Sequence, residues 1–505
     1  MRRIAVILMT GMILAAAVLS GCSGGRQEEP SNGIIVGITQ DLDSLDPHKA
    51  VAAGTKEVLY NIFEGLVKPD KDGNLIPAVA ESYEISPDGK EYTFVLRDGV
   101  KFHNGDTVTA EDVIYSLKRC SGLLTPADPG VVDEAAFSVI SDIVKADEKT
   151  IRVILDEPNT ELMGYFTCSI IPEDYTEQDT KPVGTGPYCF ESYTPLTSLV
   201  MTKNEDYYGE GKAQIDRVTF KISANTDAAF MELMAGAIDI FPYLTQEQAS
   251  QLESKYTILE GSMNLVQALF LNHASEPFDD PLVRQALCYA TDRQAVIDMV
   301  AGGRGHIIGS NMFPGFSRYY DPELETYYDY NVEKAKELLA EAGYPDGFSF
   351  TITVPSNYQF HVETAQVLAE QYRQIGVEAE IQLIEWSSWL EDVYQGRNYE
   401  ATIVGLDAQL VPSDILKRYC SDASNNFVNY QNEEFDRIFA EATATTDDSE
   451  KVRYYQELQR ILTEDAAAVY IQDPALMVAV SPDLGGYTFY PVYVQDMASI
   501  YYLEE

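Results

Sequence analysis

The second half of the chain alternates between helix and strand signals. Asp280 can cap a helix over 281–290, which has a proline in its first turn. Further helices are expected over 332–342 and 363–375, and each is followed by a glycine that can end it. Apolar residues at every second position of 377–383 then indicate a half-buried strand. Because alternating strands and helices build layered sheets, this pattern predicts an α/β fold.

Length and charge narrow the class of protein further. At 505 residues, the chain is expected to form more than one domain. Apolar residues make up 45% and charged residues 23% of the chain, a composition that can bury a large core. The formal net charge of −45 argues against nucleic acid as a partner, because nucleic-acid binding needs a basic face.

The stretch 54–119 carries the clearest local signals in the first half. A Pro-Asp-Gly turn at 87–89 separates the residues of 83–85 from an alternating apolar run over 92–96. Proline fixes one turn dihedral and glycine accepts a positive φ, so this spacing predicts a β-hairpin. Thr109 can cap the helix that follows, and the acidic residues after it lie near the positive end of that helix.

The N-terminus is expected to direct export. Two arginines precede an apolar run over 4–18, which is short for a membrane span, and Leu-Ser-Gly-Cys follows at 19–22. That tetrapeptide looks like a bacterial lipobox, which implies cleavage before Cys22 and lipidation of its thiol. The alternative is a plain secretory signal with an unrelated cysteine. We expect an exported protein, lipid-anchored to the cell membrane and facing outside or the periplasm, with residues 22–33 as a flexible tether.

Two strings resemble one known protein family. The first lies within 54–119 and includes SPDGKEYTFVLRDGVKFHNGDTVTAEDV; the second, at 283–293, is VRQALCYATDR. Both are similar to the extracellular solute-binding proteins (family 5) that feed oligopeptide and dipeptide ABC importers. The resemblance extends over nearly the whole mature chain. It implies an α/β, two-lobed periplasmic-binding-protein-like fold (class II, large) with an inserted extra α/β domain.

The same resemblance divides the chain into domains. It implies that lobe I is built from three separate segments, that lobe III is one continuous segment, and that domain II is inserted into lobe I. The expected boundaries are 1–21 for the lipoprotein signal peptide, 22–33 for the tether, 34–78 plus 185–260 plus 475–505 for lobe I, 79–184 for domain II and 261–474 for lobe III.

The resemblance also implies where a ligand would bind. Gly54 and Thr55 match a segment that leads into the ligand cleft, where glycine permits close backbone approach and threonine offers a hydroxyl. An ordinary helix start is the alternative for this pair. Asn272 lies in a segment that crosses between the lobes, and Asn357 and Tyr358 match a loop near the cleft.

A carboxylate is expected to pair with the α-ammonium group of a bound peptide. Many peptide binders of the family carry Gly-Trp and then Asp in the segment that matches 401–412. Here Leu406 replaces the tryptophan, Gln409 falls near the aspartate position, and the loop is a residue shorter. Asp407 could supply the carboxylate from a shifted position or could be an exposed loop charge. Trp389 lies beside this loop, and a core position is its alternative.

No pattern of a known enzyme is present. The sequence contains no GxSxG, no HExxH and no phosphate-binding loop, and its five histidines form no pair at i,i+4. We therefore expect no catalytic activity, no cofactor and no metal site. Donors from distant segments could still assemble in space, as in nickel-binding relatives of the family.

Five cysteines remain besides Cys22, so at least one thiol must stay unpaired in a monomer. A disulfide between Cys168 and Cys189 suits an exported protein, and buried free thiols are the alternative.

These expectations combine into one function. The chain is expected to be the lipid-anchored substrate-binding component of an ABC importer, capturing peptides between two lobes and delivering them to the permease. Its partners would be the solute, the permease subunits and the membrane, and the protein would be a monomer. The alternatives are the same fold binding an oligosaccharide, an amino acid conjugate or chelated nickel, or a ligand sensor that does not transport.

Overall fold

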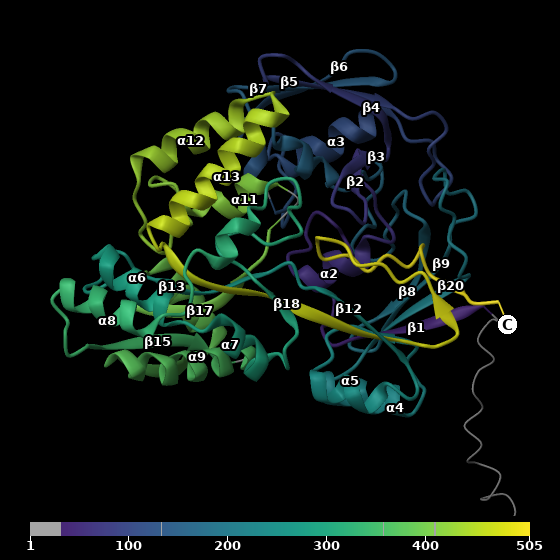
Figure 1. Ribbon diagram of the computed structural model, residues 1–505. Helices are drawn as coiled ribbons and strands as arrows, with labels where there is room; N and C mark the ends of the chain where they lie inside the picture. Colours follow the sequence, from purple (N-terminus) through teal and green to yellow (C-terminus); the bar gives the residue numbers. More distant parts are fainter. Residues whose placement is uncertain (1–31, 133, 357, 409–410, 505) are drawn as a thin grey trace, which may run out of the picture.

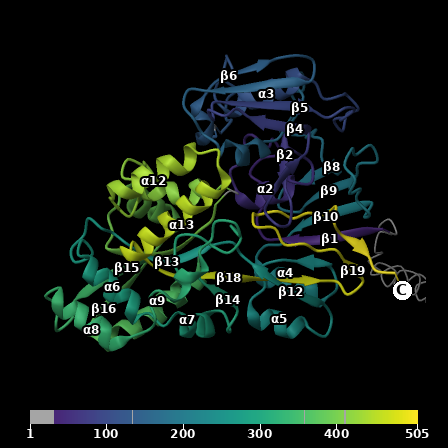
Figure 2. The same ribbon diagram turned by 45° about the horizontal axis from the view of Figure 1, so that its top comes forward.

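The computed structural model describes residues 32–132, 134–356, 358–408 and 411–504. Within these residues, twelve strands form one continuous sheet and four form a second, smaller sheet. The large sheet runs across the lower part of the molecule in Figure 1, and the smaller sheet lies at the top. The view in Figure 2 shows the same arrangement after a rotation of 45°.

One end of the large sheet is built around the first strand of the chain. β1 (Gly33–Ile38) lies between β10 and β11 and is parallel to both, and β9 and β8 follow β10 as antiparallel neighbours. Alternate residues of β1, Ile34 and Val36, are buried. The other elements at this end are β8 (Tyr188–Thr194), β9 (Ser198–Lys203), β10 (Arg217–Ile222), β11 (Ile240–Phe241), β12 (Thr257–Ser262), α2 (Ala53–Leu59), α4 (Thr226–Met234) and α5 (Gln246–Leu252).

The other end carries the helices expected from the alternating pattern. Asp280 caps α6 by accepting a hydrogen bond from the backbone N–H of Leu282 at 2.8 Å, and Asn331 caps α8 in the same way from Lys334. Both predictions are confirmed. The elements here are β13 (Val266–Leu271), β14 (Gly305–Ile307), β15 (Ser349–Pro355), β16 (Glu378–Ile384), β17 (Ala401–Leu406), α6 (Pro281–Ala290), α7 (Arg293–Val300), α8 (Val332–Glu341), α9 (Gln359–Tyr372), α10 (Trp386–Ser388), the π-helical segment Trp389–Gln395, α11 (Pro412–Leu416), α12 (Glu433–Ala444) and α13 (Asp448–Glu464).

A single long strand, β18 (Ala468–Val480), belongs to both ends of the large sheet. Its first part pairs with β13, and residues 475–480 pair with β12. Where the chain passes from β12 to β13, the N–H of Met263 donates to the carbonyl of Pro474 at 2.8 Å, and the N–H of Leu265 donates to Asp473 Oδ1 at 3.1 Å. Two neighbouring chain segments, 263–265 and 473–474, therefore connect the two ends.

The smaller sheet has the order β4-β5-β7-β6 and contains the predicted hairpin. Ile85 pairs with Tyr92, and Gly89 has a φ of +67°, so the turn prediction is confirmed. Thr109 and Asp112 form a reciprocal capping box at the start of α3, as expected. The elements of this region are β2 (Val67–Pro69), β3 (Leu75–Pro77), β4 (Ala80–Ile85), β5 (Glu91–Leu96), β6 (Ile140–Lys145), β7 (Thr150–Leu155) and α3 (Ala110–Cys120).

Two details of the second half differ from the prediction. The helix expected over 363–375 begins earlier, at Gln359, because His361 and Val362 are buried and their packing extends it toward the N-terminus. Leu383 was expected on the buried side of its strand but is 51% exposed. Its strand, β16, is the terminal strand of the large sheet, where few neighbours remain to cover a side chain.

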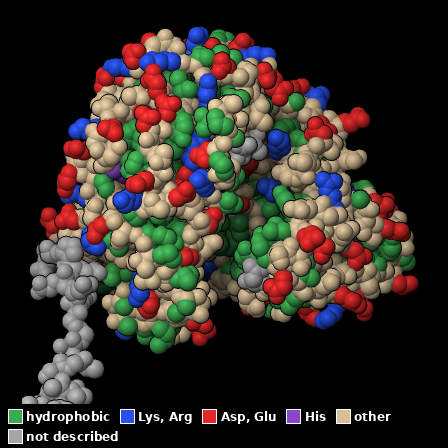
Figure 3. All heavy atoms as spheres, turned by 180° about the vertical axis from the view of Figure 1, so that it is seen from behind, with side chains coloured by type: hydrophobic (Ala, Val, Ile, Leu, Met, Phe, Trp, Pro, Cys, Tyr) green, Lys and Arg blue, Asp and Glu red, His purple; other side chains and the backbone are tan. Residues whose placement is uncertain are grey.

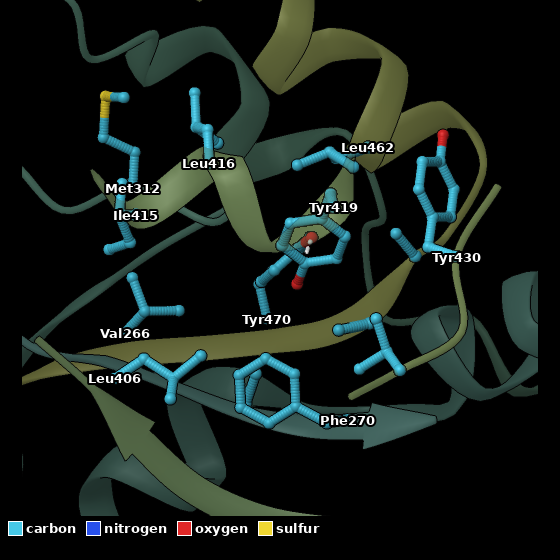
Figure 4. Packing of buried hydrophobic residues seen from close by; sticks show 14 of the residues in the cluster. Val266, Phe270, Met312, Leu406, Ile415, Leu416, Tyr419, Tyr430, Leu462 and Tyr470 are labelled. Carbon is cyan, nitrogen blue, oxygen red and sulfur yellow. Dashed lines mark hydrogen bonds between the residues drawn. The ribbon is translucent and has the colours of Figure 1, made fainter. Parts of the chain in front are cut away.

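The largest apolar cluster packs α11 and α13 against β13, β17 and β18 (Figure 4). Tyr419 and Tyr470 point toward each other in its centre, and the hydroxyl of Tyr470 donates to that of Tyr419 at 3.2 Å. This bond satisfies two hydroxyls that have lost contact with water. The cluster thereby fixes α11 over the sheet.

The described part of the chain contains no helix that is long and apolar enough to cross a membrane. The expected domain boundaries stay a prediction.

Asp473 is buried where β18 passes from one end of the large sheet to the other. Its carboxyl group predicts that the stability of the protein depends on pH. Burial raises the pKa of Asp473 from 3.8 to about 7, although backbone hydrogen bonds oppose the shift. The folded protein therefore holds this proton more tightly than the unfolded chain. The free energy of unfolding should fall as the pH rises from about 4 to 7, by up to about 1.4 kcal/mol per pH unit from this group.

Asp473→Asn should remove that contribution, because the amide keeps the shape of the protonated acid and does not titrate. Urea unfolding between pH 4 and 8 would measure the effect. We expect wild type and variant to be similar near pH 4 and the variant to be more stable at pH 7 and above. The exposed Asp227→Asn is the matched control. Parallel pH profiles for wild type and Asp473→Asn would contradict the prediction.

Candidate functional site

A cavity of about 490 Å³ lies where three regions of the chain meet. This volume is in the range of sites for small ligands. Its wall is formed by residues 47–69 with 492–494, by residues of 120–169, and by residues of 407–418. Seen from behind, the molecule is hollowed between its two main parts, and acidic side chains are spread over this face (Figure 3).

The segment with Gly54 and Thr55 forms the start of α2 beside the cavity. Thr55 is buried, and its hydroxyl oxygen accepts a hydrogen bond from the N–H of Asp43 at 3.1 Å. The Asp43 carboxylate in turn accepts from the N–H groups of Val51 and Ala52, so the two side chains together hold the loop before the helix. A Cβ atom at Gly54 would lie 2.9 Å from Gln40 Oε1. The ligand-binding roles of Gly54 and Thr55 stay predictions.

Asp407 is the described candidate residue that lines the cavity. It directly follows β17, which lies inside the sheet between β13 and β15, so the end of a well-fixed strand positions it. The residue is exposed, and within the described residues its carboxylate has no hydrogen bond or ion pair. A cationic group of a solute could therefore approach it without first displacing a protein partner.

The other described candidates lie outside the cavity wall. Asn272 is buried and donates to the carbonyls of Arg397 and Tyr399, at 3.2 and 2.8 Å. Trp389 is 2% exposed, and its indole N–H donates to Thr402 Oγ1 at 3.0 Å. Tyr358 is 42% exposed. The polar contacts of Asn272 and Trp389 are those of residues that support the fold. For all three residues, contact with a ligand stays a prediction.

Three candidates, Cys22, Asn357 and Gln409, lie outside the described residues.

The cavity wall also carries charged residues that the sequence analysis did not single out. Lys56 is exposed, and Arg418 is half-buried with its Nε donating to the carbonyl of Ile415 at 3.3 Å. Neither cation forms an ion pair within the described ranges. Glu134 also lines the wall, and burial raises its pKa. Lys56 follows Thr55 directly, so its position in the matched string could have identified it, whereas Arg418 carries no such signal.

Three potential donors to a metal ion gather on the same wall. His48, Cys120 and Cys168 place one donor atom each within 4.8 Å of one another, the one such group of His, Cys and acidic residues within the described ranges. The sulfur atoms of Cys120 and Cys168 are 2.8 Å apart, and all five described cysteines are free thiols. Of the two alternatives for Cys168 and Cys189, a disulfide or free thiols, the structure supports the free thiols. Cys189 lies on β8, in a different part of the fold.

Direct contacts bridge two of the regions that surround the cavity. Lys451, in α13, donates to Thr160 Oγ1 at 2.6 Å and lies 3.7 Å from Glu161 Oε1. The second carboxylate oxygen of Glu161 accepts from the N–H of Ser413 at 3.2 Å. Tyr165 donates to Asp414 at 3.3 Å. We call these the bridging contacts; they join the region of the smaller sheet to the helices above the second half of the large sheet.

Comparisons with known proteins agree with this architecture. The family described as bacterial extracellular solute-binding proteins, family 5 Middle, matches residues 74–427. The chain is 30% identical to heme-binding protein A of Haemophilus influenzae, over 86% of this chain and 85% of that protein. It is 25% identical to the oligopeptide-binding protein AppA of Bacillus subtilis, over 97% of both chains.

Among solved structures, the ABC transporter-associated periplasmic binding protein DppA of Helicobacter pylori in complex with the peptide STSA has a TM-score of 0.76 and 27% identity. The match covers 93% of this chain and 98% of that one. The predicted two-lobed α/β fold of periplasmic binding proteins is confirmed. The chain belongs to family 5 of the bacterial extracellular solute-binding proteins.

Proposed function

We propose that this protein is the lipid-anchored substrate-binding component of an ABC importer, that it captures peptides between two lobes, and that it delivers them to the permease. The observation that carries the proposal is the charged cavity enclosed by three regions of the chain. The names of the relatives support a peptide as the solute, since AppA is an oligopeptide-binding protein and the DppA structure holds a peptide.

The charges of the cavity wall suit a zwitterionic chain. Asp407 offers an anion, and Lys56 and Arg418 offer cations, each without an ion pair in the described part of the protein. A peptide carries a positive and a negative end, and both must be paired when the cavity closes around them. We assign the α-ammonium group to Asp407. Lys56 or Arg418 would take the carboxylate.

The two lobes would close on the solute by a hinge motion at the two segments that connect the ends of the large sheet. Within the described residues, the segments 263–265 and 473–474 connect the two ends of the large sheet. We propose that small backbone rotations in these two segments open and close the cavity. Opening would break the bridging contacts, because they join the region of the smaller sheet to the helices of the second half. The lobes would follow the boundaries expected from the sequence, with the region 79–184 moving together with the first lobe.

A bound solute should stabilise the protein. Binding to the native state alone adds RT ln(1 + [L]/Kd) to the free energy of unfolding, about 2.7 kcal/mol at a hundredfold excess over Kd. A thermal-shift screen should include peptides of different lengths, oligosaccharides, heme and nickel chelates. We expect peptides to raise the melting temperature. Stabilisation by another class alone would replace the peptide with that solute, and cleavage of the stabilising peptide would indicate an enzyme.

The assignment of Asp407 makes a sharper prediction. Asp407→Asn keeps the shape of the side chain but removes the charge that pairs with the α-ammonium group. We expect peptides with a free amino end to bind roughly tenfold more weakly or worse, and N-acetylated peptides to bind nearly as before. Isothermal titration calorimetry with both peptide forms would measure this.

The matched control for Asp407→Asn is Asp227→Asn. Asp227 is an exposed aspartate on α4, and it does not line the cavity. Equal losses for free and acetylated peptides would assign Asp407 a role in the loop instead of in charge pairing. Unchanged affinity for both would remove it from the site.

The lipid anchor depends on Cys22, because lipidation would occur on its thiol. In cells, Cys22→Ala should move the protein from the membrane fraction to the soluble fraction, or stop processing of the signal peptide. Fractionation followed by immunoblotting would show either result. The variant Cys189→Ala, which removes a different cysteine, should stay in the membrane fraction. Unchanged membrane association of Cys22→Ala would contradict the proposal.

A further inference from the structure

Two cysteines and a histidine on the cavity wall have no role in the proposed solute contacts. Cys120 is the last residue of α3, and Cys168 follows the short helix Leu162–Thr167. His48 lies in the loop before α2, with its Nε2 3.7 Å from the sulfur of Cys168 and 2.8 Å from the carbonyl of Ser169. All three side chains line the cavity. We call them the thiol cluster.

The two thiols have unequal surroundings. Cys120 is 4% exposed, and burial raises its pKa. Cys168 is half-buried, and the hydrogen bond from Cys120 together with the neighbouring His48 lowers its pKa to about 5, against the effect of burial. A thiolate is the form that attacks disulfides. Cys168 is therefore suited to attack, and Cys120 is placed to complete the exchange.

The charged groups around the cluster are fixed by the fold. Arg119 binds Asp46 through two hydrogen bonds of 2.9 and 2.7 Å and also pairs with Asp128 at 2.6 Å. Its guanidinium group favours the thiolate of Cys168, and the carboxyl group of Glu134 opposes it. Because Arg119 is held by both carboxylates, its charge stays beside the thiols.

We propose that Cys120 and Cys168 form a redox-active pair that closes to a disulfide on the cavity wall by exchange with a low-molecular-weight disulfide. The sulfurs are already in contact at 2.8 Å, and the cavity gives a small reagent access to Cys168. An exported protein would meet such oxidants outside the cell.

The exchange has two balanced steps. The thiolate of Cys168 attacks one sulfur of the reagent, a mixed disulfide forms, and the other half of the reagent leaves as a thiolate. Cys120 then loses its proton and attacks the Cys168 sulfur, which expels the second half. The two protein thiols are oxidised, one reagent disulfide is reduced, and two small thiols are released, which take up the two protons.

Peptide mass spectrometry after treatment of the reduced protein with oxidised glutathione would test the pair. Remaining thiols are blocked with iodoacetamide before digestion. We expect the peptide of Cys120 to be linked to that of Cys168, while Cys189, Cys288 and Cys420 are alkylated. A folded wild-type protein that forms no such link would overturn the proposal. Tight binding of zinc by the reduced protein, with both thiols then protected from glutathione, would assign the cluster to a metal instead.

Two serine variants separate the roles of the thiols. Cys120→Ser should accumulate a mixed disulfide between glutathione and Cys168, because the thiol that resolves it is absent. In Cys168→Ser, glutathione should attach to Cys120 at a rate at least roughly tenfold lower than its rate of attachment to Cys168 in Cys120→Ser, because Cys120 is buried and protonated. Cys189→Ser is the matched control and should form the link as wild type does. Thermal melting confirms that each variant is folded. The opposite behaviour of the two variants would overturn the assignment.

Discussion

The architecture depends on the hydrogen bonds that β18 makes with both ends of the large sheet. A sheet of this length would normally be one rigid layer, but here its continuity depends on one strand and the adjoining segment 263–265. Buried backbone groups must be paired, so both segments are held in register wherever they pass. The carboxylate of Asp473 completes that pairing at the point where the strands change partners. The two ends of the sheet pack into separate apolar clusters, two at each end.

The cavity follows from this arrangement. Asp407 directly follows β17, Lys56 lies in α2, and the region of the smaller sheet contributes Glu134 and Cys168, so residues of three regions face one space. Each residue is positioned by its own element, and no core has to be disturbed to change one wall. Such a division would let one fold hold different solutes, and the relatives carry names for ligands as unlike as heme and oligopeptides.

The sequence predicted features that are decided within a few residues. The turn at 87–89, the cap at Thr109 and the cap at Asp280 each depend on local dihedrals and hydrogen bonds, and all three were predicted correctly. The α/β class was predicted from the alternation of helix and strand signals, and the two-lobed arrangement from the resemblance of longer strings. The proximity of Cys120 and Cys168, which are 48 positions apart, depends on how α3 packs against a distant loop. No spacing rule contains that information, and the cation Arg418 was missed for the same reason.

The bridging contacts affect how firmly the two sides of the cavity hold together when no solute is bound. Lys451 and Glu161 are both buried, with side chains 9% and 4% exposed. The attraction between such charges is largely offset by the loss of their hydration, so the pair adds little net free energy while allowing only one alignment. The two sides can thus meet in a defined register without being locked together. The free energy that stabilises the closed form would then come from the bound solute. A transporter that recognises the closed form would rarely bind the protein without solute.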